Sequence, residues 1–344
     1  RASYDAPATY DFNGYTVAKP GAWSQGPAHL QALALLKGFD LASMDPTGPE
    51  FVHTVTEAIK LAFADRDAFY GDPDFVEVPL EQLLSDAYND ERRKLIGDSA
   101  SMELRHGSVD GFGCEVDYAA AVRRAEGQGV PEGGKAAAGS GEPTVGTLGQ
   151  VSGDTCHIDV VDKYGNMVAC MPSGGWLQSS PTIPALGFQL NSRAQMFWLD
   201  EGQPMSLEPG KRPRTTLSPS MALRDGKPAF AFGTPGGDQQ DQWQSIFFLR
   251  HAVYGRNLQE AIDTPSFHSE HFVSSFYPRG AKPGRLVVEG RTPEETVHNL
   301  RERGHKVEVG NLWSEGRLCT VGKDGKMLKA GSNARGMQGY AAGR

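Results

Sequence analysis

A Gly-, Ala- and Pro-rich stretch at residues 127–153 divides this chain of 344 residues into two parts of different character. The stretch has no apolar periodicity, which predicts an exposed, mobile segment. Before it, apolar residues recur mostly at helical spacing, and after it short β-rich runs alternate with turn residues. This order of elements predicts helices layered over antiparallel sheets.

Helical patterns fill most of the first part. We expect helices within residues 27–40, 48–73 and 80–97, because apolar residues recur there every three to four positions. The second pattern ends at Gly71-Asp72-Pro73, which a helix does not pass through easily.

Short strand candidates fill most of the second part. Three turns, at 162–166, 224–227 and 323–326, each lie between β-rich runs and therefore predict hairpins. Two further helices are expected at about 240–254 and 293–303. The strand candidates are 156–161, 166–172, 216–223, 227–233, 316–322 and 326–331.

Composition excludes several classes of protein. The chain has 34 basic and 42 acidic residues and a net charge of −8, whereas a nucleic-acid binder normally shows a basic stripe. No apolar run approaches the ~18 residues that a membrane helix needs. The four cysteines show no CxxC and no zinc-ligand spacing. We expect a soluble globular chain with no metal, no other cofactor and no nucleic-acid or membrane partner.

The chain begins at Arg1, followed by polar residues, with neither an initiator Met nor a signal peptide. We therefore expect it to start inside a longer gene product, and its compartment, cytoplasmic or secreted, stays open.

The junction Asp154-Thr155 is the first candidate for chemistry. A Thr hydroxyl is a poor nucleophile unless a base lies beside it. Cleavage of the peptide bond before Thr155 would create an α-amine within reach of the hydroxyl, and such an amine titrates near ~7.7–8.0. The junction alone leaves two interpretations open: a self-processed N-terminal nucleophile, or an ordinary β-branched residue that opens a strand.

Gly236 and Gly237 are the second candidate. They follow a β-rich run and precede a helical pattern, so their N–H groups would point outwards at a helix N-terminus. Such groups can stabilise the oxyanion of a tetrahedral intermediate. A simple tight turn is the alternative interpretation.

Three histidines, His157, His268 and His271, raise the question of a metal site or a Ser/His site. No carboxylate-rich partner motif supports zinc, so we interpret them as packed or solvated side chains. The absence of GxSxG weighs against a standard α/β-hydrolase.

Five motifs occur in one order along nearly the whole chain. They are EAIKLAFADRDAFYGDPDFVEVP (57–79), DTCHIDVVDKYGNMVA, KRPRTTLSPSM, FGTPGGD and TPSFHSEHF. Together they resemble the γ-glutamyltransferase (γ-glutamyltranspeptidase) family of N-terminal-nucleophile hydrolases. The resemblance implies an α+β fold, the four-layer αββα sandwich of that superfamily.

The same resemblance implies a proenzyme that cuts itself between Asp154 and Thr155. Residues 1–154 would then be the C-terminal part of the large-subunit region, and 155–344 the small-subunit catalytic region. Both would be halves of one folded domain. The N-terminal part of the large subunit, which this chain lacks, would be its partner.

Catalytic roles follow at the matching positions. Thr155 would be the nucleophile, with its freed amine as the base, and Ser173 would orient the nucleophile. Gly236 and Gly237 would supply the oxyanion N–H groups.

The implied substrate-binding residues depart from the family pattern. Thr215 and Thr216 stand where the family usually has two serines that hold the substrate carboxylate. Met196 occupies the position of the acid that binds the glutamyl ammonium group, and a thioether cannot pair with an ammonium. Arg193 adds a positive charge where the family has an amide. These departures favour a substrate that carries a carboxylate but no α-amino group, such as an acyl amide, an oxamate-like compound or a cephalosporin side chain.

We therefore expect a self-processing amidohydrolase that cleaves a small-molecule amide through an acyl-enzyme on Thr155. Two alternatives stay open: a γ-glutamyl transpeptidase or glutathione hydrolase, and a catalytically silent relative that keeps the fold.

Overall fold

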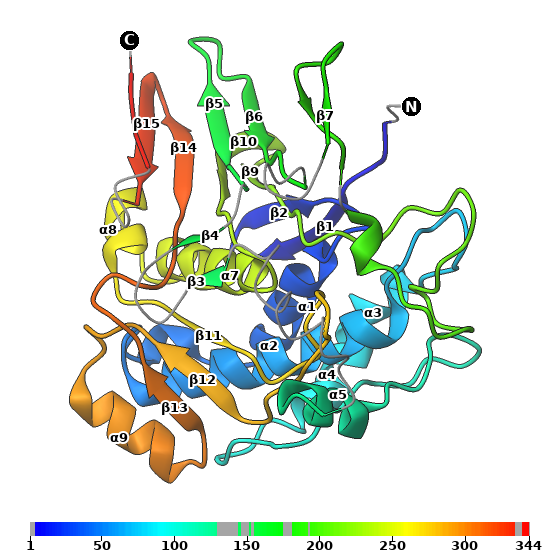
Figure 1. Cartoon of the computed structure of the whole chain (residues 1–344). Helices are drawn as coiled ribbons and strands as arrows, with labels where there is room; N and C mark the ends of the chain where they lie inside the picture. The colour runs from blue at the N-terminus through cyan, green and yellow to red at the C-terminus, as the bar shows by residue number, and fades with distance from the viewer. Residues whose placement is uncertain are drawn as a thin grey trace.

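A six-stranded antiparallel sheet with the strand order β1-β2-β9-β10-β14-β15 forms the centre of the computed structural model (Figure 1). The structure describes residues 4–128, 144–145, 151–152, 155–174, 181–191, 193–333 and 339–343. Strands β2 and β9 are neighbours, and Thr16 pairs with Leu223. The sheet thus combines strands from both sides of Thr155. The strands are β1 (Ala8–Phe12), β2 (Tyr15–Lys19), β9 (Ser220–Arg224), β10 (Lys227–Gly233), β14 (Cys319–Asp324) and β15 (Met327–Ser332).

Tight turns close the hairpins of this sheet. The predicted hairpins β9–β10 and β14–β15 are confirmed, and Asp225 in the first of them has a φ of 52°. The β1–β2 hairpin was not expected, because the first part of the chain was interpreted as mainly helical. Its turn is Asn13-Gly14, with φ values of 47° and 80°, and Asn-Gly is a strong hairpin signal.

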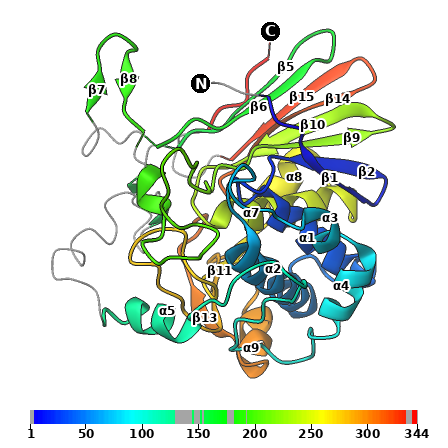
Figure 2. The same ribbon diagram turned by 90° about the vertical axis from the view of Figure 1, so that its right-hand side faces the viewer.

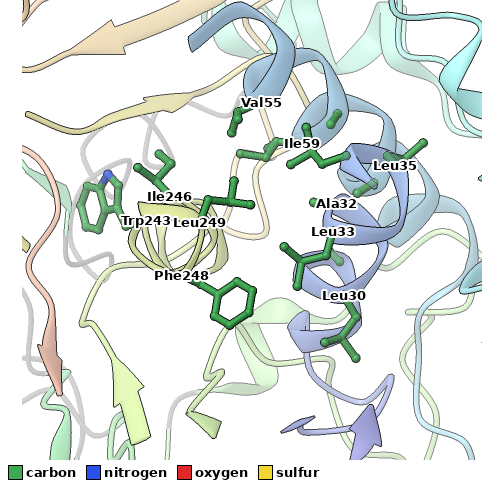
Figure 3. Packing of buried hydrophobic residues seen from close by; sticks show 14 of the residues in the cluster. Leu30, Ala32, Leu33, Leu35, Val55, Ile59, Trp243, Ile246, Phe248 and Leu249 are labelled. Atoms are coloured by element: carbon green, nitrogen blue, oxygen red, sulfur yellow. The ribbon is translucent and has the colours of Figure 1, made fainter. Parts of the chain in front are cut away.

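Three predicted helices lie on one side of the sheet. Helices α1 (Gly26–Leu36) and α7 (Gln239–Ala252) pack on its strands, and α2 (Pro49–Phe69) packs on α1. Every residue of α1 is buried, because α2, α7 and the sheet surround it. Figure 3 shows Leu33, Ile59 and Leu249, one from each helix, gathered in the same cluster of buried side chains.

A two-stranded hairpin packs on the other face of the sheet, against β10 and β14 (Figure 2). It consists of β5 (Ile158–Val161) and β6 (Met167–Cys170), both predicted. Phe232 on β10 packs on α7, while the neighbouring Gly233 faces His157 beside β5. Since neighbouring residues of a strand point to opposite faces, helices and hairpin lie on opposite sides of the sheet.

The α+β class is therefore confirmed, with three layers in the described residues: helices, the main sheet and the β5–β6 hairpin. The outward face of that hairpin exposes Ile158, Val160 and Val168 by 51–56%. A second helix layer over this face would complete the αββα sandwich, and the described residues do not supply one.

A smaller sheet lies beyond α2 and has the order β11-β12-β13. Strands β12 and β13 are parallel and are connected through the predicted helix α9. The bounds of this group are β11 (Phe267–Ser269), β12 (Arg285–Val288), α9 (Glu294–Glu302) and β13 (Lys306–Val309).

Short elements complete the chain. The helix pair predicted within 80–97 is confirmed as α3 and α4. None of the helices in the described ranges has the length and apolarity to cross a membrane. The short elements are α3 (Leu80–Leu83), α4 (Asp86–Arg93), α5 (Tyr118–Ala125), α8 (Leu258–Asp263), β3 (Thr144–Val145), β4 (Val151–Ser152), β7 (Thr182–Ile183), β8 (Phe188–Gln189) and two 3₁₀ turns, η1 (Leu41–Ser43) and η2 (Arg193–Met196).

Arg66 on α2 connects the helix layer to the loops around it. Its guanidinium is fully buried and pairs with the carboxylates of Asp67 and Asp238. It also donates to Gln25 Oε1 at 3.1 Å and to the carbonyl of Val273 at 2.9 Å. Through one side chain, α2 thereby contacts the N-terminal ends of α1 and α7 and the loop after β11.

We expect Arg66→Met to destabilise the protein by about 3–5 kcal/mol, because it removes the buried cation that pairs with both the Asp67 and the Asp238 carboxylates. Urea unfolding monitored by circular dichroism measures the change. The exposed Lys94–Glu91 pair provides the control, since Lys94→Met should cost no more than about 1 kcal/mol. Equal losses in the two variants would contradict the role given to Arg66.

Candidate active site

Thr155 and Ser173 meet where the β5–β6 hairpin joins the rest of the chain. In the hairpin Ile158 pairs with Cys170, and the same register continues outwards with a 3.2 Å hydrogen bond from Cys156 N to Pro172 O. One position further along this register, Thr155 lies opposite Ser173. Their hydroxyl oxygens are 2.6 Å apart, so the strand pairing itself creates the contact.

Arg193 joins this pair from η2. Its Nη2 donates to Ser173 Oγ at 2.8 Å, which places a buried guanidinium two hydrogen bonds from Thr155 Oγ1. The same guanidinium lies 3.6 Å from Met196 Sδ and 5.9 Å from the centre of the Phe276 ring. The predicted residues Thr155, Ser173, Arg193 and Met196 are therefore brought together by direct contacts.

The described contacts of Met196 are with apolar side chains and an arginine. Met196 is 1% exposed and packs with Met205 and Phe276. Arg279 holds the η2 turn by donating to the carbonyl oxygens of Gln195 at 3.0 Å and Phe197 at 2.5 Å. A ligand beside Met196 would thus meet a thioether, apolar side chains and positive charge.

Gly236 and Gly237 lie in the loop between β10 and α7. Gly236 has a φ of +122°, a backbone conformation that L side chains rarely adopt, and a Cβ there would lie 3.0 Å from Trp243 Cζ3. Pro235 of the same loop and Thr155 both line a cavity of about 580 Å³, so the loop and the residue border the same space.

Thr215 and Thr216 lie in the segment before β9. The backbone of Thr215 pairs with that of Trp23 and Gln25, and its hydroxyl accepts a hydrogen bond from Leu217 N at 3.1 Å. Thr216 Oγ1 is buried and has no hydrogen-bond partner within the described ranges. Of the two predicted hydroxyls, that of Thr215 is therefore used within its own loop, whereas that of Thr216 makes no hydrogen bond to the described residues.

Gln25 is a residue that sequence reasoning missed. Its backbone N–H donates to Thr215 O at 3.0 Å, its side chain donates to Gly237 O at 3.1 Å, and its Oε1 accepts from Arg66. It thereby couples the Thr215 segment to the loop of Gly237. Arg66 could have been found, since it lies inside the motif at 57–79, whereas Gln25 has no local signal.

Asp154, the other residue of the predicted cleavage site, lies outside the described residues.

The three histidines singled out earlier are all packed, as expected. His157 pairs with Asp159, and His271 accepts from Gly284 N at 3.0 Å and contacts Glu103 O. His268 Nδ1 lies 2.5 Å from Glu315 Oε2, which also accepts from Trp243 Nε1 at 3.1 Å. The Trp243 ring lies against Gly236. By holding this ring, the Glu315 carboxylate stabilises the loop of Gly236 and Gly237, called the glycine loop below.

Burial alone would lower the pKa of His268, but the Glu315 and Glu270 carboxylates outweigh it and raise the pKa to about 10. Because the ordinary value is 6.5, the charged imidazole stabilises the folded state most below pH 6.5. That contribution is lost as the pH rises towards 10.

We expect the free energy of unfolding to fall between pH 6.5 and about 10 more steeply in the wild type than in His268→Gln, which lacks this titration. Urea unfolding at a series of pH values measures the two slopes. His298→Gln, at an exposed position, should keep the wild-type slope. Identical slopes in the wild type and His268→Gln would contradict the assignment.

Comparisons with known proteins agree over the whole chain. A family model described as gamma-glutamyltranspeptidase matches residues 1–343. The glutathione hydrolase-like YwrD proenzyme of Bacillus subtilis (strain 168) is 30% identical over 348 residues, 100% of this chain and 57% of that protein. The acylase ACY 1 proenzyme of Pseudomonas sp. (strain SE83) is 31% identical over 305 residues, 88% of this chain and 45% of that protein.

A solved structure of LmbA2991HD has the same fold, with a TM-score of 0.84 and 51% sequence identity. The match covers 99% of this chain and 56% of that chain. This chain therefore spans about half the length of these three relatives.

Proposed function

Because this chain belongs to the gamma-glutamyltranspeptidase family, we propose that it is the nucleophile-bearing part of a self-processing amidohydrolase. Thr155 attacks the amide bond of a small molecule and carries the acyl group as an ester. The observation that carries the proposal is the 2.6 Å contact between Thr155 Oγ1 and Ser173 Oγ, with Arg193 donating to Ser173.

Each step of the reaction has a group to perform it. Once the bond before Thr155 is cut, its α-amine accepts the proton of the Thr155 hydroxyl as the oxygen attacks the substrate carbonyl. The N–H groups of Gly236 and Gly237 stabilise the resulting oxyanion. The same amine then protonates the leaving amine, and water or another amine releases the acyl group from the ester.

Self-cleavage leaves 1–154 and 155–344 as two associated halves of one domain. The structure supports this part of the proposal, because β1 and β2 from the first half share a sheet with β9 and β10 from the second. Lys19 of β2 also forms a fully buried 2.7 Å ion pair with Asp241 of α7. The two halves would therefore stay together after the peptide bond is cut.

A further part of the large subunit is the proposed partner. The relatives are about twice as long as this chain, and the exposed apolar side chains of β5 and β6 offer a face for additional structure. We expect that segment to complete the substrate pocket as well as the sandwich.

The acyl group of the substrate carries a carboxylate but no ammonium. Met196 provides no negative charge, and the nearby guanidinium groups of Arg193 and Arg279 repel a cation. Arg193 attracts the substrate carboxylate, and Thr216 Oγ1 supplies a hydrogen bond to it, while Thr215 holds the shape of the loop. The name of the acylase ACY 1 relative favours an acyl amide as the substrate.

The competing function is glutathione hydrolysis. The name of the glutathione hydrolase-like relative favours it. It requires a negative charge for the substrate ammonium, and the described contacts of Met196, with Arg193, Met205 and Phe276, do not provide one.

We expect Thr155→Ala to abolish both processing and amide turnover, since it removes the attacking hydroxyl, and Thr155→Ser to retain part of each. Denaturing electrophoresis and mass spectrometry should detect a fragment that begins with Thr155 in the wild type. Thr182→Ala, at an exposed position on β7, is the matched control and should behave like the wild type. A fragment that starts elsewhere, or turnover by Thr155→Ala, would overturn the proposal.

The acyl specificity is tested with a glutaryl amide and its γ-glutamyl counterpart. We expect the wild type to process the glutaryl amide at least as well, because an unpaired buried ammonium costs several kcal/mol. Met196→Asp should shift the ratio of kcat/KM towards the γ-glutamyl compound by about tenfold or more, equivalent to about 1.4 kcal/mol.

Met196→Leu, which stays apolar, is the control and should leave the ratio unchanged. A wild-type preference for the γ-glutamyl amide of about a hundredfold, or about 2.8 kcal/mol, would instead favour glutathione hydrolysis.

A further inference from the structure

His157 and Asp159 point into the space between the β5–β6 hairpin and the main sheet. They follow Thr155 at intervals of two residues, so all three side chains lie on the inward face of the same extended segment. The side chains of His157 and Asp159 are 0% and 1% exposed, and His157 Nε2 lies 2.9 Å from Asp159 Oδ1. Their remaining polar atoms, Nδ1 and Oδ2, have no hydrogen-bond partner in the described part of the chain.

The main sheet supplies a third ligand-type atom opposite them. Cys319 pairs with Gly233 across β14 and β10, so its side chain points to the same face as the hydrogen of Gly233. A side chain at Gly233 would overlap the imidazole of His157, which shows how closely the ring approaches the sheet. One nitrogen of His157, one oxygen of Asp159 and the Sγ of Cys319 all lie within 4.8 Å of one another.

We propose that His157, Asp159 and Cys319 bind one divalent cation of the zinc class. An imidazole nitrogen, a carboxylate oxygen and a thiolate sulfur are the three kinds of ligand that Zn²⁺ uses in proteins. The cation would satisfy Asp159 Oδ2, which is buried and has no hydrogen-bond partner among the described residues. It would also join the strand that begins beside Thr155 to β14 of the main sheet, which gives it a positioning role for the nucleophile.

Charge balance favours occupation of the site. Binding transfers the Cys319 thiol proton to solvent, and the thiolate and the Asp159 carboxylate together neutralise the two charges of the cation. Zinc binding should therefore release a proton and strengthen with rising pH.

A second cluster of possible ligand atoms, in His53, Glu57 and His305, lacks an uncompensated carboxylate. Glu57 already pairs with Lys60 and Arg105, so the charge of its carboxylate is compensated and two cations would repel a metal ion. In the His157 cluster, the carboxylate's described partner is the imidazole itself.

The test uses the purified full-length protein, stripped with a chelator and then titrated with Zn²⁺ or Co²⁺. We expect one cation per chain by calorimetry, and Co²⁺ should produce a thiolate-to-metal charge-transfer absorption. Saturating Zn²⁺ should raise the Tm by several degrees, because it binds only the folded state. Cys319→Ser should lose the charge-transfer band and weaken binding by at least about 100-fold.

Cys170→Ser, at an exposed cysteine on β6, is the matched control and should retain binding and the band. Asp159→Asn is nearly isosteric and gives a second weakened variant if Cys319→Ser folds poorly. No stoichiometric binding, or binding that Cys319→Ser and Asp159→Asn leave unchanged, would overturn the site. These readouts do not depend on turnover, so the outcome is separate from that of the proposed amidohydrolase activity.

Discussion

The burial of the Arg66 guanidinium is the constraint on which the surroundings of the glycine loop depend. A cation without solvent must have its donors satisfied and its charge balanced, and Arg66 achieves this with partners from four parts of the chain. Asp238 begins the segment that leads into α7, and Gln25 precedes α1. The position of each is therefore set by the same guanidinium. Gln25 in turn holds the backbone of Gly237 by donating a hydrogen bond to its carbonyl oxygen.

The Thr155 side of the candidate site depends on a different interaction, the register of the β5–β6 hairpin. Thr155 and Ser173 face each other because the strand pairing continues past the last residues of both strands. Arg193 then approaches from a separate segment, held by Arg279. One side of the site is thus positioned by buried ion pairs and the other by backbone hydrogen bonds, and the hairpin packing on β10 brings them together.

The charged side chains near Thr155 lie in loops and turns, so the proposed substrate specificity depends on them and not on the sheets. A family defined by γ-glutamyl chemistry can accept another acyl group without change to its sheets, because specificity depends on a few side chains in loops and turns. Here the turn η2 carries Arg193 and Met196, at positions that we interpret as those of an amide and an acid in the family. The proposed cation site likewise requires no change to the sheets, because its side chains lie between the β5–β6 hairpin and the main sheet, which already pack together.

Much of the fold could be predicted from the sequence, because local patterns specify it. The periodicity of 49–69 and the turn at Asp225-Gly226 are local signals, and both were interpreted correctly. The β1–β2 hairpin was missed although Asn13-Gly14 is also a local signal, because helical patterns dominated the interpretation of that half. The order of motifs likewise identified Thr155 and the glycine loop as candidates without any structure.

Only the tertiary structure decided which distant residues share a site. Gln25 lies beside Gly237 because α1, α2 and α7 pack together, and Cys319 lies beside His157 because β14 pairs with β10. The cysteine spacing predicted scattered thiols, and spacing alone could not show that Cys319 and His157, so far apart in the sequence, lie close together. The physical reason is that helix and turn signals arise from neighbouring residues, whereas sheet register and layer packing depend on contacts across the whole chain.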